Sequence, residues 1–313
     1  MPCKEEKKLL IITGPTAVGK SDLAIKIAQK INGEIISADS CQVYKYMDIG
    51  SAKIKKEEMQ DIRHYLIDCL LPDEEFNVSI FKKMALEAIN EIYSRGKIPI
   101  IVGGTGFYIQ ALLYDINFED EPSDNEIREE LTRYLEVNGN EKLHNLLKEC
   151  DYESSLLIHP NNAKRVIRAI EYFRLHNSKI SEHNENEKVK TSNYDSLYVV
   201  LNAPREQLYA NINKRVDIMM KNGLVDEVCR LIDLGYDRKY NSMQAIGYKE
   251  VVDYLDGIIS YDECVELIKK NTRHFAKRQL TWFRREKDVY WIDKTLFNNE
   301  EDIVEEIFNE LLQ

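Results

Sequence analysis

Short apolar runs alternate with amphipathic segments through the first third of the chain. Apolar runs of strand length occur at residues 9–13, 34–38, 65–68 and 98–102. Between them, residues 22–31 and 79–95 place apolar side chains at helical spacing, which predicts amphipathic helices. Strands that alternate with helices pair as parallel sheets with helices on their faces. The pattern therefore predicts an α/β fold.

The pattern changes between residues 119 and 190, where no strand-like run occurs. The segment begins with an acidic stretch, residues 119–124, and ends near a polar run, residues 181–193, for which we expect a mobile loop. Helical spacing predicts three helices, at residues 125–137, 141–149 and 162–176. Because it offers no strand to a sheet, we expect this segment to be a helical insertion into the core.

The α/β pattern then returns, so that the core is expected in two parts, residues 1–118 and 191–313. Strands are predicted at residues 197–201 and 289–292. Long helices are predicted at residues 205–234, 244–255 and 260–287, followed by a terminal helix.

Composition sets limits on the class of protein. With 313 residues, of which 43% are hydrophobic, the chain can bury a full core. The sequence has no apolar run of about eighteen residues, so we expect no membrane association. Six scattered cysteines form no Cys-x-x-Cys pair, which indicates a reduced cytoplasmic protein without a zinc site. We expect the protein to be a monomer. The net charge of −11 argues, as an average, against a nucleic-acid partner.

A phosphate-binding loop (P-loop) pattern, G-x-x-x-x-G-K-[ST], follows the first predicted strand and precedes the first helix. This is the context in which such a loop wraps a phosphate with backbone N–H groups at a helix N-terminus. Its lysine reaches the terminal phosphates, and its hydroxyl residue binds Mg²⁺. The loop consists of Gly14, Pro15, Thr16, Ala17, Val18, Gly19, Lys20 and Ser21.

Two further strand ends carry candidate chemistry. Asp39 ends the second predicted strand, where a carboxylate can act as a general base, as a Mg²⁺ partner or only as a turn cap. The strand at residues 98–102 ends in Gly103, Gly104 and Thr105 and not in the Mg²⁺-binding Asp of a nucleotide hydrolase. Because the carboxyl ends of parallel strands meet at one edge, these groups should lie near the phosphate loop.

Two basic stretches contrast with the acidic average. Lys164, Arg165 and Arg168 are neighbours on one predicted helix. Residues 269–287 contain eight Lys or Arg and one Glu, a local charge of +7. A solvated helix face is the alternative, but few acidic residues are interleaved, which favours a polyanion such as nucleic acid.

These residues together resemble the bacterial-type tRNA dimethylallyltransferase (tRNA isopentenyltransferase) family along nearly the whole chain. Besides the phosphate loop, the motifs that carry the resemblance are Asp39-Ser40-x-Gln42-Val43-Tyr44, Met47-Asp48-Ile49-Gly50-Ser51-Ala52-Lys53, His64-Tyr65-Leu66-Ile67-Asp68, Val102-Gly103-Gly104-Thr105-Gly106, His159-Pro160-Asn161-Asn162, Ile246-Gly247-Tyr248 and the run from Ala276 to Arg284.

The resemblance implies a P-loop NTPase-like parallel sheet core with a helical insertion that binds the anticodon stem-loop. The implied activity is transfer of a dimethylallyl group from dimethylallyl diphosphate to N6 of adenosine 37 in tRNA, with Mg²⁺. Asp39 would be the general base, Thr105 would lie in the reaction channel, and Arg215 would hold the diphosphate with Lys20 and with Mg²⁺ on Ser21. The residues implied to contact tRNA are Asp39, Ser40, Cys41, Gln42, Lys164, Arg165, Arg168, Gln244, Gly247, Lys249, Lys277, Arg278, Gln279 and Arg284.

Three other interpretations share parts of this pattern. A P-loop nucleotide kinase would have the same loop but would not need the basic helix or the insertion. An isopentenyltransferase that acts on free adenylate would likewise need no tRNA-binding surface. A non-enzymatic RNA-binding protein would not need the intact phosphate loop.

Overall fold

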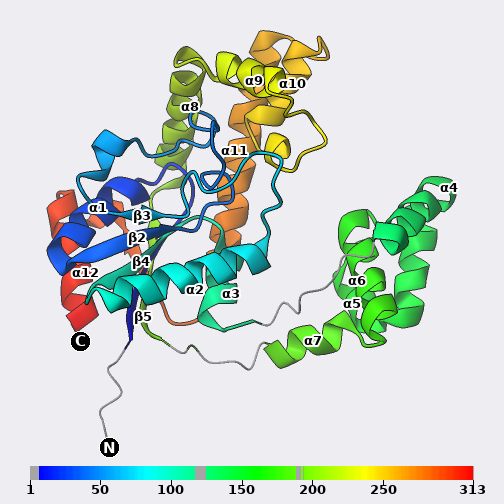
Figure 1. Ribbon diagram of the computed structural model, residues 1–313, viewed down its shortest axis with the longest axis horizontal. Coiled ribbons are helices and arrows are strands. Elements are labelled where there is room, and N and C mark those ends of the chain that lie inside the picture. The colour runs from blue at the N-terminus through cyan, green and yellow to red at the C-terminus, as the bar shows by residue number, and fades with distance from the viewer. Residues whose placement is uncertain (1–6, 117–124, 188–191, 193, 313) are drawn as a thin grey trace, which may run out of the picture. The chain divides into compact units, whose positions relative to one another are not determined.

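The computed structural model describes residues 7–116, 125–187, 192 and 194–312 (Figure 1). It divides into two compact units. The core unit comprises Met1–Leu113 and Asn193–Gln313, and the insertion unit comprises Tyr114–Ser192. The domain boundaries expected at 118/119 and 190/191, and the acidic stretch at 119–124, lie outside the described residues.

The core unit is built on a six-stranded parallel sheet, which confirms the predicted fold class. Its strand order is β3-β2-β4-β1-β5-β6, so β1 lies between β4 and β5. Residues 9–12 of β1 are fully buried, as expected for a strand covered by helices on both faces. The strands are β1 (Lys8–Thr13), β2 (Gly33–Ser37), β3 (His64–Tyr65), β4 (Ile98–Gly103), β5 (Asp195–Asn202) and β6 (Val289–Asp293).

One strand is shorter than the sequence predicts. The apolar run at residues 65–68 forms β3 only over His64–Tyr65. Leu66 and Asp68 have φ angles of 61° and 54°, in the left-handed region, and a chain in that conformation cannot continue an extended strand.

Helices of the core unit fall into two groups. The first covers the sheet: α1 (Lys20–Ile31), α2 (Val78–Ser94), α3 (Gly106–Leu113) and α12 (Glu300–Leu312), with α1 beside α12 (Figure 1). The second group contains α8 (Arg205–Lys221), α9 (Leu224–Asp233), α10 (Tyr248–Leu255) and α11 (Tyr261–Phe283). Short 3₁₀ turns occur at Lys56–Met59, Ser242–Gln244 and Lys294–Leu296. Across the described residues, we find no helix with the length and apolar character needed to span a bilayer.

Two glycines change the helix boundaries predicted for this second group. The single helix predicted over residues 205–234 is wrong, because Gly223, with φ 93°, separates α8 from α9. The helix predicted from residue 244 begins only at Tyr248, because Gly247 has φ 98°. A left-handed conformation favours glycine and interrupts a right-handed helix.

A second apolar cluster joins α8, α9, α10 and α11 to the chain that follows β2. Val43, Tyr44 and Met47 from this chain pack with Val228 of α9 and Tyr248 of α10. The segment after Asp39 is therefore part of a packed core and not a free surface loop, which restricts where Asp39 can lie.

The insertion unit is helical in its described residues. It contains α4 (Asn125–Cys150), α5 (Tyr152–Leu157), α6 (Ala163–His176) and α7 (Ile180–Glu187) around a core that includes Leu131, Leu147 and Ile170. Gly139, with φ 79° and ψ 172°, kinks α4 into the two helices predicted for this stretch.

Part of the polar run at residues 181–193 forms α7, so the mobile loop expected there is wrong for residues 181–187. The buried Asp151 carboxylate accepts hydrogen bonds from Ser181 N, at 3.0 Å, and from Ser181 Oγ, at 2.7 Å. A carboxylate bound to a first-turn N–H stabilises a helix start. This tertiary contact is not visible in the local sequence pattern.

Candidate active site

Three loops meet at the carboxyl edge of the adjacent strands β2, β4 and β1. Ala38 N donates to Val102 O at 2.8 Å, and Thr105 N donates to Ala38 O at 3.3 Å. Thr13 Oγ1 donates to Gly103 O at 2.6 Å. The phosphate loop, the turn at Asp39 and the loop that carries Thr105 therefore share one rim, as their positions after predicted strands indicated.

The phosphate loop has the strained backbone that its glycines allow. Gly14 has φ 144°, and a Cβ atom there would overlap the carbonyl oxygen of Leu201. Gly19, with φ 86°, forms the N-cap of α1, so Lys20 is the first residue of that helix. The loop thus leads directly into a helix N-terminus, where backbone N–H groups and the helix dipole favour an anion.

Lys20 and Arg215 bring two cations to this rim from different helices, α1 and α8. Lys20 Nζ donates to Gly14 O at 3.0 Å and to Pro15 O at 2.9 Å. Burial, together with the charge of Arg215, lowers the pKa of Lys20 to about 8, although Asp39 opposes the shift. Burial also lowers the pKa of Arg215. Cations whose charge is penalised by burial and by each other gain most when an anion binds between them.

Asp39 completes the charged group and also caps its own turn. Its Oδ1 accepts hydrogen bonds from Cys41 N at 2.8 Å and from Gln42 N at 3.3 Å. Among the described residues, no hydrogen bond reaches its second oxygen, Oδ2. Asp39 therefore caps the turn with Oδ1, and its Oδ2 is available to accept a proton or a hydrogen bond.

Cys41 is a thiol and not a thiolate at neutral pH. Burial, and secondly the charge of Asp39, raises the pKa of Cys41 to about 12. A raised pKa disfavours the thiolate, which is the nucleophilic form of cysteine.

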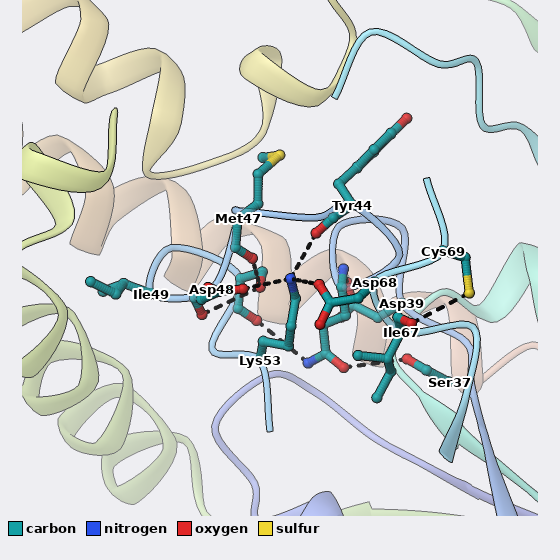
Figure 2. Close-up of polar contacts among 12 residues, drawn as sticks. Ser37, Asp39, Tyr44, Met47, Asp48, Ile49, Lys53, Ile67, Asp68 and Cys69 are labelled. Atoms are coloured by element: carbon teal, nitrogen blue, oxygen red, sulfur yellow. Dashed lines mark hydrogen bonds and ion pairs between the residues drawn. The ribbon is translucent and has the colours of Figure 1, made fainter. Parts of the chain in front are cut away.

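Lys53 stabilises the loop that follows Asp39 through hydrogen bonds and ion pairs, as Figure 2 shows. Its side chain is 4% exposed, and Nζ donates to Tyr44 O at 2.7 Å, to Asp48 Oδ1 at 2.6 Å and to Asp68 Oδ1 at 2.5 Å. A cation with two carboxylate partners and a carbonyl is well satisfied although it is buried. The sequence motif contains Lys53, but its spacing gave no role to it.

Glu227 of α9 holds the same loop through its backbone N–H groups. It is 2% exposed, and its Oε2 accepts from Asp48 N at 3.0 Å and from Ile49 N at 2.8 Å. Its Oε1 accepts from Gly50 N at 3.1 Å and from Tyr248 Oη at 2.8 Å. Sequence reasoning missed Glu227, although a signal existed: a glutamate on the apolar face of a helix beside buried leucine and valine side chains.

Comparison with known proteins agrees with this geometry. A family model described as IPP transferase matches residues 42–286, which is more than half of the chain. The chain belongs to the IPP transferase family. The resemblance inferred from the motifs is thereby confirmed.

Individual members of the family align with nearly the full chain. It is 57% identical to a tRNA dimethylallyltransferase of Lachnoclostridium phytofermentans and 50% identical to one of Acetivibrio thermocellus, with 96% of both chains covered in each case. A solved tRNA isopentenylpyrophosphate transferase from Bacillus halodurans is 42% identical, with a TM-score of 0.74 and coverage of 98% of this chain and 97% of that one. A eukaryotic dimethylallyltransferase acting on tRNA has a TM-score of 0.83 at 32% identity, covering 98% of this chain and 79% of that chain.

The residues expected to contact tRNA in this transferase lie in several settings. Ser40, Cys41 and Gln42 form the turn beside Asp39, and Gln42 Nε2 also donates to Ala52 O at 3.4 Å. Exposed members of the set are Lys277 and Arg278 on α11, Arg284 directly after α11, Gln244 before α10, and Lys164, Arg165 and Arg168 on α6 of the insertion unit.

Three members of the expected tRNA-contacting set have internal partners. Gly247 is buried, and its N–H donates to Glu250 Oε2 at 2.7 Å. Lys249 forms an ion pair with Glu250 at 3.6 Å. Gln279 is only 7% exposed and uses both ends of its amide inside the core unit. Gly247 and Gln279 are therefore buried groups whose hydrogen bonds hold the fold, and a tRNA contact at either stays a prediction.

Proposed function

We propose that the protein transfers the dimethylallyl group of dimethylallyl diphosphate to N6 of adenosine 37 in tRNA, beside the anticodon. The observation that carries the proposal is the charged group at the rim: two cations, Lys20 and Arg215, that interact electrostatically with each other and with the carboxylate of Asp39. Such a site matches an anionic leaving group on one side and an amine that must lose a proton on the other.

The phosphate loop supplies the donor site in this proposal. The backbone N–H groups at the start of α1 bind the diphosphate, and Lys20 and Arg215 neutralise the charge that develops as its bond to carbon breaks. Preorganised cations aimed at a developing negative charge are often the largest single contribution to catalysis. Burial strengthens this effect, since water does not screen these cations fully.

Asp39 acts on the acceptor. The N6 lone pair forms the new C–N bond to the first carbon of the dimethylallyl group, the C–O bond to diphosphate breaks, and the N6 proton passes to Asp39. An aromatic amine is a weak nucleophile, so a positioned base assists as the bond forms. The adenine leaves its stack in the anticodon loop to reach the rim, as bases do in enzymes that act on them. Thr105, on the neighbouring loop, lines this channel.

Magnesium fits this site as an ion shared with the donor. Within the described residues, no three His, Cys, Asp or Glu side chains gather as a metal site. The hydroxyl of Ser21, at the start of α1, is an oxygen ligand of the kind that Mg²⁺ accepts, and Mg²⁺ is commonly held by few protein groups together with substrate phosphates. Ser21 would be its protein ligand, and the ion would supply further neutralisation of the diphosphate charge.

One assay tests the proposal against its alternatives. The protein is incubated with Mg²⁺, labelled dimethylallyl diphosphate or labelled ATP, and either unmodified tRNA or free AMP. We expect label from the prenyl donor to appear in tRNA, at adenosine 37. Transfer to free AMP would identify an adenylate isopentenyltransferase, phosphate transfer from ATP would identify a kinase, and tRNA binding without transfer would identify a binding protein.

A further inference from the structure

Gln279 lies on the inner face of a helix whose outer face is basic. Ala276, Gln279 and Phe283 of α11 are buried, whereas Lys277, Arg278 and Arg284 are exposed. The same short segment therefore contains surface cations and a polar side chain that faces the core unit. A buried amide costs free energy unless its hydrogen bonds are made, so its partners show what it does.

Both ends of the Gln279 amide bind backbone groups at the rim. Its Oε1 accepts a hydrogen bond from Thr16 N at 2.9 Å, and its Nε2 donates to Gly104 O at 2.9 Å. The partners fix the orientation of the amide, because Thr16 N can only donate and Gly104 O can only accept. Glutamine offers one acceptor and one donor in this arrangement without a charge at any pH, whereas glutamate does so only when its carboxyl group is protonated.

The amide of Gln279 approaches Gly104 closely. A Cβ atom on residue 104 would overlap Gln279 Nε2. The second glycine of the Gly103-Gly104-Thr105 sequence is therefore matched to Gln279, about 175 positions later in the chain, as its packing partner.

We propose that Gln279 is a positioning residue, which sets the distance between the phosphate loop and the loop that carries Thr105. Thr16 belongs to the loop that binds the diphosphate, and Gly104 precedes the residue that lines the acceptor channel. Gln279 thus joins a loop of the proposed donor site to the loop of the proposed acceptor site. This inference rests on the proposed function, and it replaces a tRNA contact as the role of Gln279.

A Gln279→Leu variant separates the two roles. It removes both hydrogen bonds at similar volume, so the loops lose their spacing while the basic face of α11 stays intact. We expect single-turnover transfer at saturating tRNA and donor to slow by about 10²-fold, since small misplacements of reacting groups have effects of this size. The dissociation constant for tRNA should change by less than about twofold, because the exposed cations are unaltered. Lys277→Ala, two positions earlier, should weaken tRNA binding and serves as the matched comparison.

A Gln279→Glu variant gives a second readout that a merely structural role would not produce. A neutral carboxyl group can accept from Thr16 N and donate to Gly104 O, but an ionised one has no proton to donate. A buried carboxyl group titrates above its usual range. The rate of Gln279→Glu relative to the wild-type protein should therefore rise several-fold as the pH falls from about 8 to about 6. Thermal unfolding of each variant checks that it is folded.

The outcomes are distinct. Loss of tRNA affinity in Gln279→Leu with an unchanged saturated rate would overturn the positioning role and restore a tRNA contact. A Gln279→Glu rate ratio that does not vary with pH would also overturn it, even if the leucine variant does not fold. Absence of transfer by the wild-type protein would instead refute the proposed function itself.

Discussion

Two sets of cations in this protein differ in their surroundings more than in their chemistry. Lys20 and Arg215 lie at the rim of the sheet, where burial lowers the pKa of each. Lys277 on α11, Arg284 directly after α11, and Lys164 on α6 are exposed. Water and salt screen the exposed set, whereas the buried set acts at short range through a lower effective dielectric. We infer that the buried set serves bond breaking and the exposed set serves binding of a large polyanion.

The largest test of this contrast concerns the carboxylate that the buried cations face. Asp39→Asn keeps an oxygen that can accept from Cys41 N, so the turn cap is retained, but it removes the base. We expect single-turnover transfer to slow by about 10²- to 10³-fold with tRNA affinity nearly unchanged, because a general base acts in the transition state. If the asparagine variant transfers at the wild-type rate, Asp39 is only a cap.

Removing a buried cation should have the next largest effect. Lys20→Ala is expected to lower kcat/KM for dimethylallyl diphosphate by about 10²-fold, the size found when one preorganised charge-stabilising group is lost. Lys26→Ala is the matched control, because Lys26 lies on the same helix but pairs with Glu300 and Glu301 on the outside of the unit. Equal kinetics for the two variants would show that the loop is not the donor site.

Two buried carboxylates, one in each unit, differ in how much they should contribute to the free energy of unfolding. Glu227 has four hydrogen-bond donors in the core unit, whereas Glu171 in the insertion unit, 1% exposed, has the guanidinium of Arg128 at 2.9 Å. The Arg128 side chain is 46% exposed and can be hydrated if its partner is lost.

We therefore expect Glu227→Ala to lower the free energy of unfolding by about 3 kcal/mol, because it leaves several donors unpaired. Glu171→Ala should lower it by only about 1 kcal/mol. Urea unfolding, with amide hydrogen exchange to assign each loss to its unit, measures both. A larger loss for Glu171→Ala would contradict the argument from unpaired donors.

The sequence predicted the strands and the chemical groups of the rim better than it predicted the contacts that hold them. The buried strands and the phosphate loop carry local signals, such as short apolar runs and fixed glycine spacing. Gln279 and Glu227 bind groups that are far away in the sequence, and Lys53 binds loop groups 5 to 15 positions away that share no helical or strand period with it. The helix predicted over residues 205–234 ignored the break at Gly223, because the helical pattern of apolar residues continues on both sides of that glycine. For α7, the stabilising Asp151 lies outside the helix itself.

The ionisation of Lys20 gives a smaller, graded test. Its pKa of about 8 in the free protein means that it is charged below that pH and loses its proton as the pH rises. The value of kcat/KM for the donor should therefore fall above about pH 8, by up to tenfold per pH unit. Saturating donor should reduce the effect on kcat, because a bound diphosphate stabilises the charged amine. Lys20→Arg should move the fall to higher pH, and an unshifted profile would assign it to another group.

Screening supplies the mildest test and addresses the exposed set alone. Binding of tRNA should weaken steeply with salt despite the net charge of −11, since neutralised phosphates release their counterions. Reversing the charge of Lys277 and Arg284, or of Lys164, Arg165 and Arg168, should weaken binding and flatten the slope of log K against log salt, by about one for each phosphate that is no longer neutralised. Binding of inorganic diphosphate should stay unchanged in the variants with altered α6, because the donor site belongs to the core unit. Titrations of the wild-type protein and both variants at several salt concentrations measure these slopes. Equal slopes in all three proteins would mean that these cations form an ordinary solvated surface. The inference that the exposed cations serve polyanion binding while the buried ones serve bond breaking would then be wrong.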